Sequence, residues 1–185
     1  GDLVLIDAGC EFENYAADIT RTFPINGKFS PEQAAIYDIV LDAQLQAIAA
    51  LKPGAPYSGA NDATVRVITQ GLRDLGILQG DVSELIEQES YKEFYMHSSG
   101  HWLGMDVHDV GDYKIDNQWR VYEPGMVVTV EPGIYISPDN KLVAEKWRGL
   151  AVRIEDDIAI TKTGYEDLTS TFPKTRHDIE SLMAG

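Results

Sequence analysis

The amino-acid sequence predicts an α+β fold in which helices cover one face of an antiparallel sheet. Apolar runs typical of strands stand at the beginning and in the second half of the chain, and two long helical patterns lie between them. Because strands do not alternate with helices, a doubly wound parallel sheet is disfavoured. The chain has 185 residues, of which 44% are hydrophobic, so it is long enough to bury a sizeable core.

Two strands are expected first. Residues 2–8 form a Leu-rich apolar run, and residues 14–25 form a second one after a short link, which favours a hairpin. Residues 3–6 have the composition of a core strand. Since domains seldom open on a buried strand, we expect residues 1–185 to be part of a longer protein.

Two long helices follow. Ser30 can cap a helix, Pro31 suits its first position, and Gln33 completes a capping box. The apolar periodicity continues to Leu51, and Pro53-Gly54 ends the helix. The remaining expected helices cover residues 59–75, 82–89 and 175–184, and the remaining expected strands cover Phe94–His97, Met126–Val130, Gly133–Ile136 and Ala151–Thr161.

The charge balance restricts the possible partners. There are 30 acidic and 15 basic residues, and the net charge is −15, which argues against partners bound through phosphates, so neither nucleic acid nor a membrane surface is expected. No stretch has the length of a membrane helix. The single cysteine, Cys10, excludes a disulfide within the chain and fits a reducing compartment, so we expect a cytoplasmic location.

Three histidines lie close together in what we interpret as a loop or an irregular strand. His97, His101 and His108 share one 12-residue window that contains glycine and serine. Histidine is the commonest metal ligand and the usual acid or base near neutral pH. The alternative is a set of polar side chains that hydrogen-bond within a turn.

Four carboxylates interrupt apolar strand patterns: Asp7, Asp18, Glu131 and Glu155. Such side chains are expensive to bury unless they are paired or bound to metal. Each alone could be a solvent-facing strand end, which is the simpler interpretation for Asp7. Together they suggest convergence on one sheet face, where two divalent cations would balance four negative charges. An oxygen-rich set with one imidazole suits Mn²⁺, and Co²⁺, Zn²⁺ or Fe²⁺ are alternatives.

The order of these blocks resembles that of Xaa-Pro aminopeptidases, especially the bacterial aminopeptidase P type, and of prolidases. All five blocks of the resemblance occur in order between residues 6 and 157. They are Ile6–Gly9, Asp18–Phe23, His101–Asp109, Glu123–Gly133 and Arg153–Asp157.

The resemblance implies a pita-bread fold with a binuclear metal centre. Asp7 and Asp18 would hold the first ion, Asp18 and Glu155 would bridge both ions, and His101 and Glu131 would complete the second. The implied reaction is hydrolysis of the N-terminal Xaa-Pro bond by a hydroxide that bridges the two ions. The implied substrates are peptides with proline at the second position.

The resemblance also implies roles for residues around the ions. Glu131 would act as general base, and His108 would stabilise the oxyanion or deliver a proton. His97, Arg153 and Tyr135 would line the substrate site. The alternatives are loop hydrogen bonding for His97, an ion pair with a neighbouring acid for Arg153, and core packing for Tyr135.

Two other functions stay open at this point. A prolidase, which cleaves only Xaa-Pro dipeptides, would share the site, and a pita-bread binding module would have lost catalysis. The resemblance further implies that residues 1–185 are the C-terminal part of a catalytic domain. The upstream half of that domain and a separate N-terminal domain would precede it, and the full-length protein would form a homo-oligomer.

Overall fold

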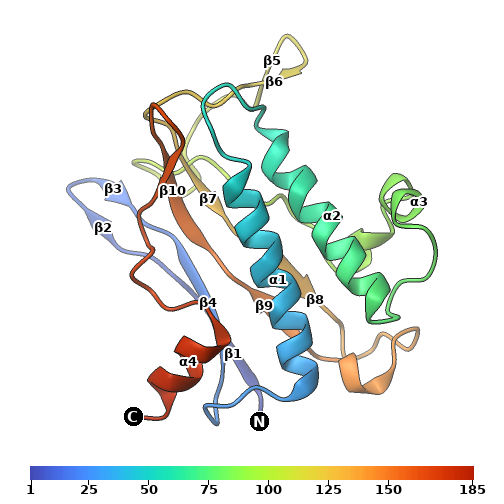
Figure 1. Ribbon diagram of the computed structural model, residues 1–185. Coiled ribbons are helices and arrows are strands. Elements are labelled where there is room, and N and C mark those ends of the chain that lie inside the picture. Colours follow the sequence, from blue (N-terminus) through green and yellow to red (C-terminus); the bar gives the residue numbers. More distant parts are fainter.

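The structure is a computed structural model that describes residues 1–185. Its strands and helices follow the expected order (Figure 1). The helices are α1 (Pro31–Ala49), α2 (Ser58–Asp74), α3 (Val82–Glu87) and α4 (Arg176–Met183), with 3₁₀ helices at Ser90–Glu93 and Glu145–Trp147. The strands are β1 (Leu3–Ala8), β2 (Glu11–Phe12), β3 (Tyr15–Ala16), β4 (Ile19–Pro24), β5 (Lys114–Ile115), β6 (Gln118–Trp119), β7 (Val127–Val130), β8 (Gly133–Tyr135), β9 (Ala151–Arg153), β10 (Asp156–Ile160) and β11 (Tyr165–Asp167).

Every strand pair is antiparallel, as the sequence predicts. β1 pairs with β4, and the hairpin β2–β3 extends beyond the end of that pair. β8 pairs with β9, while β10 lies between β7 and β11. No helix is long and apolar enough to cross a membrane.

The two long helices cover the strands of the second half of the chain. In Figure 1, α1 and α2 lie side by side, and α1 packs against β7, β8 and β9. The predicted capping box is present, because the Ser30 hydroxyl accepts from the Gln33 N–H at 3.2 Å and the Gln33 side chain accepts from the Ser30 N–H at 2.9 Å. The main core includes Ile36 and Val40 of α1, Ile68 of α2, Ile134 of β8 and Val152 of β9.

The expectation of a buried first strand is wrong for the C-terminal part of β1. Residues 3–5 are half-buried, but Ile6 is 49% exposed and Asp7 is exposed. β4 is the only strand that pairs with β1, so the other edge of β1 carries no strand. The apolar composition alone did not reveal this position at a sheet edge.

Three other expected strands also differ. Phe94–His97 is irregular chain after a 3₁₀ helix, and Phe94 and Tyr95 are buried against the core rather than paired in a sheet. The expected strand Ala151–Thr161 is two strands, because β9 pairs with β8 whereas β10 pairs with β7. The chain therefore leaves the strand geometry at Ile154-Glu155, and Glu155 is one of the predicted metal ligands. The expected strand 14–25 is also two strands, β3 and β4, which pair with β2 and β1 respectively. The short strands β2, β5, β6 and β11 have no counterpart in the prediction.

Candidate metal centre

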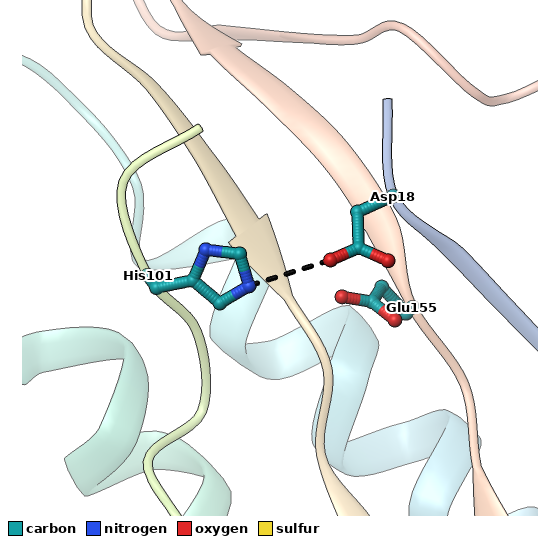
Figure 2. A group of neighbouring side chains, drawn as sticks. All are labelled: Asp18, His101 and Glu155. Carbon is teal, nitrogen blue, oxygen red and sulfur yellow. Dashed lines mark ion pairs between the residues drawn. The ribbon is translucent and has the colours of Figure 1, made fainter. Parts of the chain in front are cut away.

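Three of the predicted ligands point toward one another (Figure 2). Asp18 stands directly before β4, His101 lies in the irregular loop, and Glu155 occupies the break between β9 and β10. One ligand atom from each lies within 4.8 Å of the other two. Segments far apart in sequence thus bring two carboxylates and an imidazole to one point, as the sequence predicts.

The His101 ring is oriented for ligation. Its Nδ1 lies 3.0 Å from the carbonyl oxygen of Trp102, an acceptor, so Nδ1 carries the proton. Nε2 faces Asp18 Oδ2 at 3.4 Å and Glu131 Oε1 at 3.5 Å. A neutral ring with the proton on Nδ1 would present the Nε2 lone pair to a cation held between these oxygens, which is the arrangement of a metal ligand.

The other two predicted ligands lie at the edge of this group. Glu131 follows β7 and contacts His101, as the preceding distance shows. Asp7, near the end of β1, adjoins Asp18 closely enough to raise its pKa, but its own carboxylate forms an ion pair with Arg153. The alternative interpretation of Arg153, a pair with a neighbouring acid, therefore describes this structure.

The carboxylates lack sufficient positive charge from the protein. Burial is the main cause that raises the pKa of Glu155 to about 8, and the charge of Glu131 adds to it. Burial likewise raises the pKa of Glu131 to about 7, against the opposing effect of Arg153. Burial and the neighbouring Asp7 raise the pKa of Asp18. Divalent cations would relieve this repulsion, so the residues present fit a metal site.

The predicted catalytic and substrate residues border a cavity of about 860 Å³ next to these acids. The exposed His108 ring stands edge-on to His101 with 4.3 Å between ring centroids. His97 Nε2 lies 2.8 Å from the Tyr135 hydroxyl, which also accepts from Arg153 Nη1 at 3.2 Å. His97, His108 and Arg153 line the cavity, and the half-buried Tyr135 supports two of them rather than packing in the core.

Several residues that hold the site were not predicted. The Thr20 hydroxyl donates to Glu155 Oε2 at 2.5 Å, and the Thr129 hydroxyl accepts from the His101 N–H at 3.0 Å. The Tyr57 hydroxyl donates to the carbonyl of Gly100 at 2.7 Å and so fixes the start of the histidine segment. In the sequence, Thr20 is marked only by the alternation of Thr20 and Thr22 within an apolar strand. The structure buries both threonines fully.

Comparison with known proteins identifies the family. The model of metallopeptidase family M24 matches residues 1–162. The chain belongs to this family. It is 61% identical to Xaa-Pro aminopeptidase of Haemophilus influenzae over 99% of its own length, and it spans 42% of that protein.

Solved structures give the same result for the fold of this M24 chain. The structure of Pseudomonas aeruginosa aminopeptidase PepP matches all of it with a TM-score of 0.99 and 64% identity, over 42% of that chain. A zinc-substituted E. coli aminopeptidase P in complex with product matches with a TM-score of 0.96 and 54% identity, over 41% of that chain. The chain therefore has the pita-bread fold of these proteins and spans less than half of their length.

Proposed function

We propose that the protein containing this chain is an Xaa-Pro aminopeptidase, which hydrolyses the bond between an N-terminal residue and a proline that follows it. The observation that carries the proposal is the group Asp18, His101 and Glu155, with Glu131 beside it. His101 and Glu131 of this group line the adjoining cavity. The names of the 54–64% identical M24 relatives supply the substrate class. Residues 1–185 would form the C-terminal part of the catalytic domain.

The proposed ligands are the five that the sequence indicates: Asp7, Asp18, His101, Glu131 and Glu155. They would hold two divalent ions, with Mn²⁺ favoured by the predominance of oxygen donors. When bound, these ions would lower the pKa of a water molecule between them and polarise the scissile carbonyl. On metal binding, the Asp7 carboxylate would either leave its ion pair with Arg153 or bind the ion and Arg153 together.

The residues of the chain supply the proton transfers. Glu131, which lies beside His101 and lines the cavity, accepts a proton from the attacking water. His108, exposed next to His101, donates to the carbonyl oxygen or protonates the proline nitrogen. Protonation matters because the nitrogen of a tertiary amide leaves poorly as an anion.

A connected set of side chains positions the substrate. His97 and Arg153 line the cavity, and the Tyr135 hydroxyl contacts both side chains and would hold them in position. The proposal also includes a cytoplasmic location and a homo-oligomeric full-length protein. The free thiol of the exposed Cys10 supports a reducing compartment.

The test is an assay of the full-length protein, supplied with Mn²⁺, on an Xaa-Pro-Yaa tripeptide and an Xaa-Pro dipeptide. We expect release of the first residue from the tripeptide. Cleavage of the dipeptide alone would indicate a prolidase. A protein that binds no divalent ion and cleaves neither peptide would be a binding module, and the proposal would be wrong.

A further inference from the structure

One buried acid next to the metal centre has no part in the proposed reaction. Asp157 lies on β10, two residues after Glu155, and is only 3% exposed. Its Oδ2 accepts a hydrogen bond of 3.1 Å from the backbone N–H of Asp18. Its Oδ1 is buried without any hydrogen-bond partner. Burying a carboxylate with one unpartnered oxygen costs free energy of folding. Such a group is therefore expected to have a role, and its one side-chain hydrogen bond is with Asp18.

The backbone at Asp18 lies where two strand ladders meet. The β1–β4 ladder ends at the pair Ala8 and Ile19, and the β2–β3 ladder begins on the other side of Gly9. A Cβ at Gly9 would lie 1.6 Å from the carbonyl oxygen of Ala17, so only glycine permits this close approach. Asp18 therefore stands in the gap between the ladders, and Asp157 supplies the acceptor for its N–H.

Asp157 is itself held firmly. Its N–H donates to the Thr169 hydroxyl at 3.1 Å, and its carbonyl accepts from the Leu168 N–H at 2.9 Å. On its other side it stands opposite Thr129 of β7, the residue whose hydroxyl accepts from the His101 N–H. Asp157 thus belongs to the same strand pair, β7–β10, that fixes His101 through Thr129. It also lies only two residues after Glu155 in the chain.

We propose that Asp157 is a positioning residue for the metal centre: its side chain fixes the backbone of Asp18 and thereby directs the Asp18 carboxylate toward His101 and Glu155. The inference rests on the proposed function, because it requires that Asp18 bind metal. It adds a residue that touches neither ion nor substrate and acts through one hydrogen bond.

The test compares metal binding by variants of the full-length protein. Metal-free protein is titrated with Mn²⁺ by calorimetry, and electron paramagnetic resonance reports whether the two ions are magnetically coupled through shared ligands. Asp157→Leu removes the acceptor and is expected to weaken binding of one ion by about 10–100-fold and to abolish coupling. Asp157→Asn keeps an acceptor oxygen and is expected to bind within about threefold of wild type with coupling intact.

A third variant covers the case in which Asp157→Leu does not fold. Asp157→Glu keeps charge and acceptor but displaces the contact by one methylene, so we expect weaker binding and reduced coupling. The matched control is Asp167→Asn on β11, a neighbouring acid that pairs with Lys174 and contacts none of the proposed ligands. It is expected to leave both Mn²⁺ affinities unchanged.

The outcomes separate the two proposals. If wild type binds two coupled ions and Asp157→Leu and Asp157→Glu do the same, the positioning role is wrong while the metal site stands. Equal weakening by Asp157→Asn and Asp157→Leu would also overturn it, because the hydrogen bond would then not be the cause. If wild type binds no Mn²⁺, the proposed function itself fails.

Discussion

Glu155 and Asp156 are consecutive, equally buried carboxylates that the fold treats in opposite ways. Glu155 faces Asp18 and Glu131, accepts one hydrogen bond from Thr20, and has its pKa raised to about 8, mainly by burial. Asp156 is fully buried on the other side of the chain. It accepts from the side chains of Arg21, Gln44, Thr169 and Lys174.

The difference lies in where the compensating charge comes from. Burial alone would raise the pKa of Asp156, but the charge of Arg21 and the hydrogen bonds from Lys174 and Thr169 lower it below its usual value. The protein therefore neutralises Asp156 with its own cations. For Glu155 and its neighbours, Arg153 is the nearby cation and pairs with Asp7. Asp156 is thus neutralised within the protein, whereas for Glu155 and its neighbours the proposed metal ions would supply the compensating charge.

The largest expected effect is on catalysis. Glu155→Gln keeps the size of the side chain but removes a charge shared by the two proposed ions. We expect kcat/KM on an Xaa-Pro-Yaa peptide to fall by about 10³-fold or more, together with loss of one bound ion per chain. Asp156→Asn is the matched variant, and it should keep both ions. Near-normal turnover by Glu155→Gln would refute its place in the site.

The second prediction concerns the stability of the metal-free protein, measured by urea unfolding. Asp156→Asn leaves Arg21 and Lys174 without their carboxylate, and we expect a loss of about 3 kcal/mol. Glu155→Gln removes an uncompensated buried charge, and at pH 8 we expect a gain of about 1 kcal/mol. Two changes of the same sign would show that the two acids do not differ as the geometry indicates.

The third prediction is a pH dependence with a defined sign. Glu131 and Glu155 have pKa values of about 7 and about 8, above those of the unfolded chain. The folded state therefore binds more protons, and the stability of the metal-free protein should fall as pH rises from about 5 to about 8. Saturating Mn²⁺ should abolish or reverse this slope. A metal-free protein whose melting temperature rises over that range would contradict the assignment.

The smallest expected effect tests how Glu155 is oriented. Thr20→Val keeps the shape of the side chain but removes the hydroxyl that donates to Glu155 and accepts from Arg153 Nε at 3.2 Å. We expect Mn²⁺ affinity to fall about tenfold. Thr22→Val is the control, since the Thr22 hydroxyl bonds the backbone of Arg153 instead. Equal effects of the two variants on Mn²⁺ affinity would show that the Thr20 hydroxyl has no specific role.

Local signals in the sequence were sufficient for the helices and for selecting the candidate site residues. Ser30, Pro31 and Gln33 predict the start of α1 because a capping box involves only neighbouring residues. Asp18, Glu131 and Glu155 stand out because charged side chains in apolar runs require compensation wherever they are placed. Their pattern suggested that the acids would meet on one face of a sheet, and the structure brings Asp18 and Glu155 together.

Tertiary structure decided which strands pair and which residues are therefore buried. It exposed the end of β1, divided residues 151–161 between two sheets, and turned residues 94–97 into buried irregular chain. It also placed Asp156 with cations and Asp157 against Asp18. Strand pairing joins residues far apart in sequence. No local pattern therefore distinguishes the three consecutive acids. Glu155 faces Asp18 and His101, Asp156 binds Arg21 and Lys174, and Asp157 accepts a hydrogen bond from the Asp18 N–H.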